Sequence, residues 1–383
     1  MRKVAILGSG LTKYGKSDLG IIDLLSEASI KAFEDSNTQD KNFDSVFVGN
    51  MSSAEYEGIC GIHNALVSEL SLEPAFACKI ENTSGSGGAA VLAGFTAIAS
   101  GMSDLTLVAG GEKMTGVSTE MSTDIIASLT HPEEYKQGAT LPSFAGLLAR
   151  YYMEKYNAPR EALAKIAVKN HYNGSLNPQA QFHKIISIRD ALESPIIADP
   201  LRLFDFCPVS DGAAAMILAP ADEAAKYVDH PVLISGIAGA TDTHAVHERE
   251  DLSTAQAVKK AGQKAYQMAS KTPEEIDVAE LHDMSTIMEL VQSEDLDFFK
   301  KGEAWKAVME GETELKGRLP INTSGGLKAK GHPLGATGVS QIIEIQNQIL
   351  GRCEARQVKS DVGLACNVGG FGNSAVVAIL ERI

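Results

Sequence analysis

One order of elements occurs twice along this chain of 383 residues. Each half presents an apolar strand, an amphipathic helix, a second strand, a glycine-rich turn, a buried helix and a further strand. The tetrapeptide NTSG occurs in both halves, at 82–85 and at 322–325. Strands that alternate with helices are typical of α/β proteins. We therefore predict an internal duplication of one α/β unit, with halves at 1–230 and 231–383.

The segment 87–100 is small and apolar on every face, which predicts a helix enclosed on all sides. Between the halves, residues at about 115–210 are more polar and irregular. We expect them to form an insertion on the first unit that covers a substrate site. The remaining predicted strands are 4–7, 45–48, 105–109, 232–237, 276–281 and 374–380, and the remaining predicted helices are 23–35, 147–156, 254–270 and 331–350.

The charge and the cysteines exclude several classes of protein. The net charge is −15 and no run of Lys or Arg occurs, which argues against nucleic acid and anionic membranes as partners. Five scattered cysteines without a C-x-x-C pair predict a reducing, cytoplasmic environment and neither a disulfide framework nor a metal site. The apolar run at the start is too short for a signal peptide or a membrane span.

Two glycine-rich segments hold candidate catalytic side chains. Ser84, in IENTSGSGGAA, precedes the buried helix, where backbone N–H groups favour developing negative charge. The alternative is an ordinary serine N-cap. His332, in GGLKAKGHPLGATG, can titrate near neutral pH and act as a base. The alternative is a histidine on a surface turn.

Two strand ends hold further candidates. His282, in ELHDMST, could donate a hydrogen bond to a carbonyl oxygen, or it could serve as a strand-end cap. Cys366, in LACNVGGFGNSA, precedes a glycine turn, although free cysteines are more often buried and inert. The segment Gly8–Gly10 does not begin a dinucleotide-binding loop, because Lys13 occupies the position of the third glycine.

Together these segments resemble the thiolase superfamily, in particular the archaeal and sterol-carrier-protein-type acetyl-CoA acetyltransferases. GHPLGATG at 331–338 is similar to the G-H-P-x-G-x-(S/T)-G block, and Cys366 with GGFG resembles the C-x-G-G-G-x-G block. HDMS at 282–285 resembles H-D-C-F, and GEKM at 111–114 and CPVSDGAAA at 207–215 resemble the same branch. These matches run in order from residue 4 to the C-terminus.

The resemblance implies a thiolase fold: duplicated βαβαβαββ halves in a five-layer α-β-α-β-α core, with an inserted loop domain. It implies an acetyl-CoA C-acetyltransferase, which catalyses the reversible Claisen condensation of acetyl-CoA to acetoacetyl-CoA. Coenzyme A thioesters are then the substrates, and no other cofactor is implied. Such proteins are homodimers or homotetramers. The archaeal ones also join a hydroxymethylglutaryl-CoA synthase and a small OB-fold protein.

The resemblance also implies roles for individual residues. Position 84 takes the acyl group, and His332 removes its proton. Cys366 deprotonates the α-carbon of a second acetyl-CoA, and His282 holds the enolate oxygen. The backbone N–H groups of Ser84 and of the turn Val368, Gly369 and Gly370 stabilise the tetrahedral oxyanion.

The chain departs from the family pattern at three places. Ser84 replaces the nucleophilic cysteine, Met284 and Ser285 replace the C-F of H-D-C-F, and Val368 replaces a glycine. A serine hydroxyl needs stronger activation than a thiol. Ser84 is either an engineered change that traps an acyl-CoA or a natural residue, and acyl transfer is disabled or altered. The alternatives to a thiolase are a thiolase-fold lyase (a retro-aldolase on acyl-CoA) and a non-catalytic acyl-CoA-binding scaffold.

Overall fold

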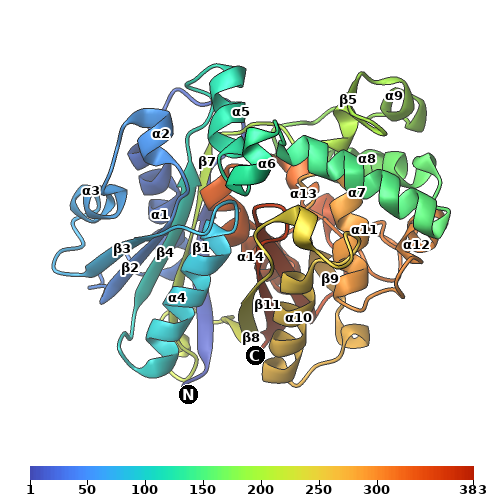
Figure 1. The fold of residues 1–383 in the computed structure, drawn as a ribbon. Coiled ribbons are helices and arrows are strands. Elements are labelled where there is room, and N and C mark those ends of the chain that lie inside the picture. Colours follow the sequence, from blue (N-terminus) through green and yellow to red (C-terminus); the bar gives the residue numbers. More distant parts are fainter.

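Two matching sets of strands and helices form the core of the computed structural model, which describes residues 1–383 (Figure 1). The first set comprises β1 (Val4–Leu11), α1 (Ile21–Ser36), β2 (Ser45–Gly49), β3 (Phe76–Ile80), α4 (Ser86–Ser100), β4 (Thr106–Glu112) and β7 (Gly212–Pro220). The second set comprises β8 (Val232–Thr241), α10 (Gln256–Ala269), β9 (Val278–Glu280), α14 (Leu334–Leu350), β10 (Val362–Gly369) and β11 (Ser374–Arg382). The predicted duplication of one α/β unit is confirmed.

The strands of both sets form one nine-stranded sheet in the order β3-β2-β4-β7-β1-β8-β11-β10-β9. The two halves of this sheet meet where β1 pairs with β8 in antiparallel fashion. Outward from that junction, the first half continues with β7, β4 and β2, and the second half continues with the equivalent strands β11, β10 and β9. A parallel bridge joins Ala279 of β9 to Ile321, the residue before the second NTSG. This contact matches the parallel pairing of β2 with β3, which precedes the first NTSG.

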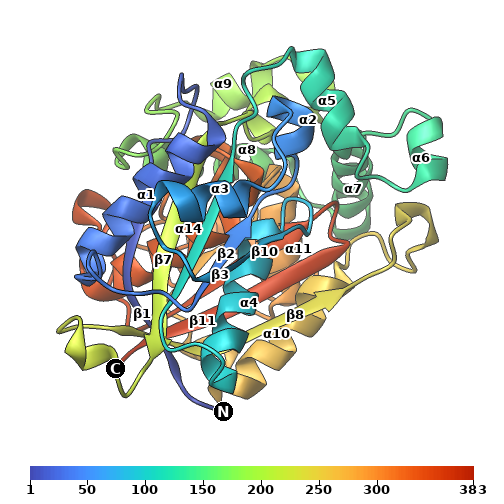
Figure 2. The same ribbon diagram turned by 90° about the vertical axis from the view of Figure 1, so that its left-hand side faces the viewer.

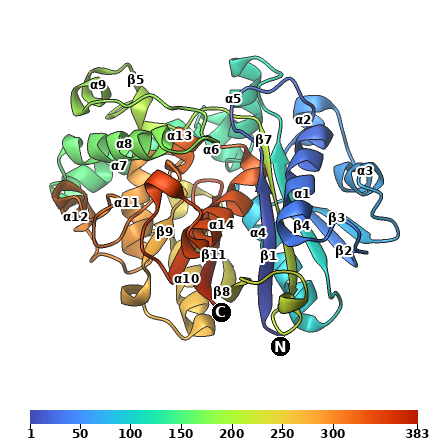
Figure 3. The ribbon, with the colours of Figure 1, turned by 180° about the vertical axis from the view of Figure 1, so that it is seen from behind.

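Helices cover both halves of the sheet and also separate them. α1 and α3 (Ile62–Glu69) pack on the outer face of the first half, and α10 and α11 (Thr286–Asp295) pack near the second. α4 and α14 lie between the halves, as the view from behind also shows for α14 (Figure 3). Three large apolar clusters fill the spaces between these layers. The five-layer α-β-α-β-α core is therefore confirmed.

The two central helices approach each other through glycines. A Cβ atom added to Gly338 on α14 would lie only 2.2 Å from the backbone nitrogen of Gly88 on α4. Nearly every residue of α14 is buried. The prediction that 87–100 is enclosed on all sides is wrong for one face, because Thr96 and Ser100 are exposed at the far end of α4.

The insertion interrupts the first half between β4 and β7 but packs largely on the second half. It contains α5 (Thr119–Ala127), α6 (Pro132–Lys136), α7 (Leu141–Tyr156), α8 (Arg160–Ser175), α9 (Ile188–Glu193), β5 (Ile196–Ala198) and β6 (Leu201–Arg202). α8 contacts α11, α12 (Ala304–Glu310) and α13 (Gly326–Lys330). A buried ion pair of 2.6 Å between Lys169 and Glu289 fixes that contact. The insertion therefore spans both halves, at the end of the molecule opposite the two termini (Figure 2).

Several elements were not predicted. The strand β7 has the sequence GAAAMILAP and is buried throughout, so its residues do not alternate between apolar and polar. The edge strand β3 and the short α2 (Ser53–Glu57) were also missed, as was α11. No helix of the structure is both long enough and apolar enough to cross a membrane.

Candidate active site

Ser84 lies in the tight turn that leads into α4. The Gly85 amide donates to the carbonyl of Asn82 at 2.9 Å, and Thr83 adopts a left-handed φ of 51°. The Ser84 hydroxyl is buried and donates to the backbone carbonyl of Val368 at 3.0 Å. No side-chain hydrogen bond caps α4. Ser84 is therefore not an ordinary N-cap, because its hydroxyl faces the end of β10.

His332 lies on the short connection between α13 and α14 and is buried, so it is not a surface histidine. Its Nδ1 lies 2.7 Å from the Thr337 hydroxyl, which itself donates to the Pro333 carbonyl at 2.9 Å. That hydroxyl has no second hydrogen, so it accepts from His332 Nδ1–H. Burial, assisted by the charge of Lys330, lowers the pKa of His332 to about 3. The neutral ring therefore keeps a free lone pair on Nε2.

His282 follows β9, and its main chain is held by Gln292, which accepts from the His282 amide at 2.9 Å and donates to its carbonyl at 2.8 Å. Its ring lies edge-on to that of His332, with centroids 4.9 Å apart. Burial and the neighbouring His332 lower the pKa of His282 well below its ordinary value. Its Nε2 is buried without a protein partner.

Asn367 on β10 determines which nitrogen of His282 carries the proton. Its side-chain oxygen accepts from the Gly88 amide at 3.0 Å, so its NH₂ group faces the other way. That NH₂ donates to His282 Nδ1 at 3.1 Å and to the Ser84 carbonyl at 3.3 Å. Because Nδ1 accepts, the hydrogen of the neutral ring lies on Nε2. The two histidines therefore hold opposite tautomers: His332 offers a base and His282 offers a donor.

The structure does not bring Cys366 into this site. Successive side chains of a strand point to opposite faces, and Asn367 faces Ser84 and His282. The thiol of Cys366 consequently faces the other way and is fully buried in the apolar cluster that α10 and α11 share with the sheet. This burial raises its pKa. The expected role of Cys366 at the substrate α-carbon is therefore wrong. Adjacent residues of a strand point to opposite faces, and Asn367 is the one that faces the site.

The predicted glycine turn lies beside Ser84. Val368 supplies the carbonyl that accepts from the Ser84 hydroxyl. Gly369 ends β10, and Gly370 follows with a φ of 60°, which favours glycine. The structure shows no protein acceptor for the amides of Ser84 and Gly370. Both are therefore free to donate to a bound group.

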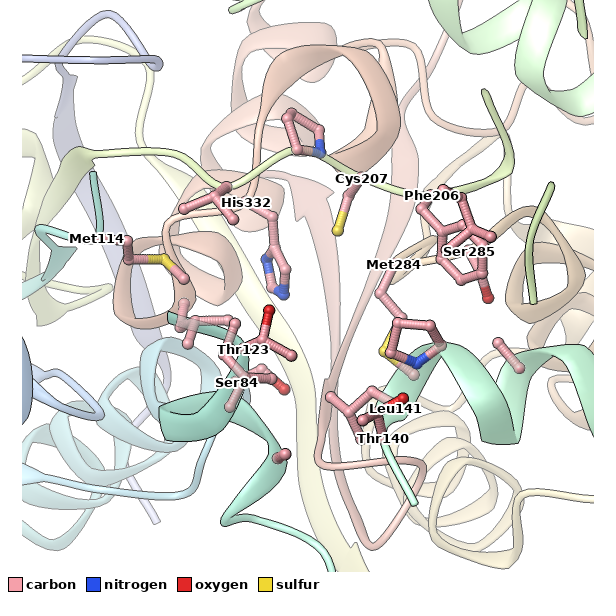
Figure 4. Close-up of a pocket in the computed structure, with 18 of the residues that line it drawn as sticks. Ser84, Met114, Thr123, Thr140, Leu141, Phe206, Cys207, Met284, Ser285 and His332 are labelled. Carbon is pink, nitrogen blue, oxygen red and sulfur yellow. The ribbon is translucent and has the colours of Figure 1, made fainter. Parts of the chain in front are cut away.

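A cavity of about 250 Å³ opens beside these residues. Ser84 and His332 line it, and Figure 4 shows the His332 ring and the Cys207 sulfur directed toward the same space. Most of its other lining is apolar and comes from the insertion and the segment after β9, namely Met114, Thr123, Ile126, Ala127, Leu129, Thr140, Leu141, Pro142, Ala145, Ile197, Leu203, Phe206, Pro208, Val209, Met284, Ser285 and Leu334. The insertion thus covers the site.

Sequence reasoning missed two residues of this region. Asn367 was passed over because it lies next to the more conspicuous Cys366, and only the strand direction shows which of them faces the site. Cys207 was noted only as part of the segment CPVSDGAAA. Its position at the end of the insertion gave no sign that it would line the cavity with Ser84.

A buried carboxyl group supports α13, the helix that precedes His332. Asp283 follows His282 and accepts from the Leu327 amide at 2.6 Å and from the Asn170 side chain at 2.7 Å. Burial, with the neighbouring carboxylate of Glu289, raises the pKa of Asp283 to about 8. Asp283 therefore holds the start of α13 against the strand end that carries His282.

Two family models match the chain and together cover nearly all of it. The thiolase N-terminal domain matches residues 4–222, and the thiolase C-terminal domain-like model matches residues 238–382. The fold and the site together define an α/β protein with paired histidines beside a helix start. This chain belongs to the thiolase family.

Individual relatives agree with this assignment. An acetyl-CoA acetyltransferase of Methanothermobacter thermautotrophicus is 41% identical over the full length of both chains. Human sterol carrier protein 2 is 32% identical, over all of this chain and 72% of its own length. Among solved structures, the Ltp2-ChsH2(DUF35) aldolase shares the fold with a TM-score of 0.86 and 23% identity, over 99% of this chain and 98% of that chain.

Proposed function

We propose that the protein is an acetyl-CoA C-acetyltransferase, which forms and cleaves a carbon–carbon bond next to a coenzyme A thioester. The observation that carries this proposal is the pair of opposite tautomers at His332 and His282 beside Ser84. A Claisen condensation requires a base and a donor to the enolate oxygen, and this pair supplies both. The full-length relative named acetyl-CoA acetyltransferase supports the same activity.

Acyl transfer begins at position 84. His332 Nε2 takes the proton of the Ser84 hydroxyl as the oxygen attacks the thioester carbonyl. The protonated ring then gives this proton to the sulfur of the departing CoA, which leaves as the thiol. The hydroxyl must first leave the Val368 carbonyl to which it donates. The unpaired amides of Ser84 and Gly370 are suited to hold the oxyanion. An oxygen ester is less reactive than a thioester, so we expect this transfer to be slow.

The second stage concerns the enolate of a CoA thioester. His282 Nε2–H has no protein partner and is suited to donate to the enolate oxygen. Because burial keeps the His282 ring neutral, it acts as a hydrogen-bond donor rather than as an acid. The apolar insertion over the cavity excludes water and so strengthens this hydrogen bond.

A second candidate is a lyase that splits a β-hydroxyacyl-CoA by a retro-aldol reaction. Two observations favour it: position 84 holds a hydroxyl, and the Cys366 thiol faces away from the site. In that reaction His332 removes the proton of the β-hydroxyl group and His282 stabilises the enolate. No covalent acyl-enzyme forms, so Ser84 is not needed as an acceptor.

The variants Ser84→Cys and Ser84→Ala separate the two candidates. If the protein is an acetyltransferase, Ser84→Cys should accelerate thiolysis of acetoacetyl-CoA by at least about 100-fold, because a thiol attacks a thioester more readily. Mass spectrometry should then find an acetyl group on residue 84 after incubation with acetyl-CoA. Ser84→Ala should abolish both. Lyase activity on a β-hydroxyacyl-CoA that survives in Ser84→Ala would support the lyase instead.

A third outcome remains for the same experiment. Neither variant should show turnover if the chain only binds acyl-CoA as a scaffold. In that case acetyl-CoA would still bind to the wild type, to Ser84→Cys and to Ser84→Ala with similar affinity, as isothermal titration calorimetry can measure. That result would contradict both catalytic candidates.

We also propose that the chain forms a homodimer through the edge strand β3. This strand pairs with β2 on one side only, and Phe76 at its start is 63% exposed. An edge strand offers unpaired backbone groups to a second copy.

Assembly with a hydroxymethylglutaryl-CoA synthase and an OB-fold protein is part of this proposal, supported by the presence of a DUF35 protein in the name of one structural neighbour. The five free cysteines support a cytoplasmic location.

A further inference from the structure

We propose that Cys207 is the catalytic thiol that transfers a proton to and from the substrate α-carbon. The proposal rests on the acetyltransferase function above and supplies the acid and base that Cys366 does not. Cys207 lies at the end of the insertion, between η1 (Leu203–Asp205) and β7. Of the five cysteines, it alone lines the cavity with Ser84 and His332.

The position of Cys207 is fixed by the residue that replaces the expected family thiol. Its amide donates to the Met284 carbonyl at 3.1 Å, and Met284 stands where the H-D-C-F block has its cysteine. Figure 4 shows the Cys207 sulfur directed toward the space between Met284 and the ring of His332. A thiol is therefore present on this wall of the cavity although the H-D-C-F segment contains none.

A buried lysine accompanies Cys207. Lys328 on α13 donates through Nζ to the carbonyl of Phe206, the residue before Cys207. Burial lowers the pKa of Lys328 to about 8, and burial raises the pKa of Cys207 to about 12. The thiol is consequently protonated at neutral pH, as a proton donor must be. The nearby ammonium stabilises the thiolate that remains after the proton has been given away.

Unpaired polar atoms on the same wall indicate a ligand. Ser285 lines the cavity, and the ring of His282 lies edge-on to that of His332, which also lines it. The Ser285 hydroxyl and the His282 Nε2 are both buried and lack a protein partner. Buried polar atoms usually have a partner, so these two are available to a polar group of the substrate. A thioester oxygen bound to His282 would bring the adjacent α-carbon to this part of the cavity.

The proton transfer balances as follows. When the carbon–carbon bond of the β-ketoacyl-CoA breaks, its electron pair passes to the α-carbon and the thioester oxygen as an enolate. The S–H bond of Cys207 then breaks and a C–H bond forms at the α-carbon, which gives acetyl-CoA and the Cys207 thiolate. In the direction of synthesis, the neutral Nε2 of His332, which lines the same cavity, first takes the thiol proton, and the resulting thiolate then removes a proton from the α-carbon of acetyl-CoA.

Exchange of the acetyl protons in D₂O tests this step without acyl transfer. Wild-type protein incubated with acetyl-CoA should incorporate deuterium into the methyl group, as measured by NMR. Cys207→Ala and Cys207→Ser should slow this exchange by about 100-fold or more, which is typical for the loss of an acid or base. The thermal midpoint and acetyl-CoA affinity of Cys207→Ser should match those of the wild type, which excludes misfolding.

Two further variants provide controls. Cys78→Ala, on the edge strand β3, and Cys366→Ala, on the buried face of β10, should exchange at the wild-type rate. The exchange itself requires no acyl-enzyme, so a loss of exchange confined to the Cys207 variants tests this proposal independently of acyl transfer to residue 84. Undiminished exchange in Cys207→Ala, or no exchange in the wild type, would overturn the role of Cys207.

Discussion

The Asn367 side chain donates to His282 Nδ1 over 3.1 Å and thereby places the only hydrogen of that imidazole on Nε2. The orientation of the amide is itself fixed by the Gly88 amide at the start of α4, 3.0 Å from its oxygen. A residue on the last strand pair and a glycine of the central helix thus determine the chemistry of a histidine that follows β9.

Replacing Asn367 with alanine should release the tautomer of His282. We expect Asn367→Ala to lower the rate of carbon–carbon bond formation by about 100-fold while acetyl-CoA still binds, because removing one donor to a developing oxyanion has an effect of this size. The variant should also lose about 1–3 kcal/mol of stability, since the Gly88 amide would be left unpaired. Kinetics and urea unfolding measure the two effects. A variant with unchanged rate would show that Asn367 does not position His282.

The pH–rate profile should lack the decrease near pH 6.5 that protonation of an ordinary histidine causes. The pKa of His332 is lowered to about 3, so its neutral form persists well below the usual pKa of about 6.5. The rate should therefore stay level as the pH falls through about 6.5 and decline only at a pH closer to that of the lowered value. A pH–rate profile of acetoacetyl-CoA thiolysis by Ser84→Cys checks this. A midpoint near 6.5 that disappears in His332→Asn would contradict the burial argument.

Adding one methyl group between the central helices should destabilise the fold. A Cβ at Gly338 would meet the Gly88 nitrogen at 2.2 Å, and backbone cannot yield as a flexible side chain can. Gly338→Ala should therefore lower the free energy of unfolding by about 1–3 kcal/mol, despite the higher helix propensity of alanine. Gly116→Ala is the matched control, because nothing lies within 4 Å of its added Cβ. Equal urea midpoints for the two variants would rule out this close contact.

A charge at the exposed edge should prevent dimer formation. Phe76→Lys places a lysine at the start of β3, where pairing with a second copy would bury it. We expect this variant to elute as a monomer in size-exclusion chromatography with light scattering, whereas the wild type elutes as a dimer. Ile185→Lys changes an equally exposed apolar residue in the insertion and should leave the dimer intact. A dimer that tolerates Phe76→Lys would place the interface elsewhere.

Much of the site could be predicted because its residues lie at the ends of regular elements. Ser84 before α4, His332 before α14 and His282 after β9 each stand at a glycine-rich or polar break in an apolar pattern. The duplication brings the starts of the two central helices together, so Ser84 and His332 meet at the cavity. His282 reaches the ring of His332 because β9 ends on the same side.

The sequence by itself determined the duplicated α/β architecture, the family and the three breaks that carry Ser84, His282 and His332, because periodicity and glycine positions are local properties. Tertiary structure alone decided which face of β10 points into the site. In the folded chain the side chain of Cys366 lies in the core and that of Asn367 points toward His282, because successive side chains of a strand point to opposite faces. Tertiary structure also brought Cys207 to the cavity, because the insertion packs across both halves and no local pattern records that long-range contact.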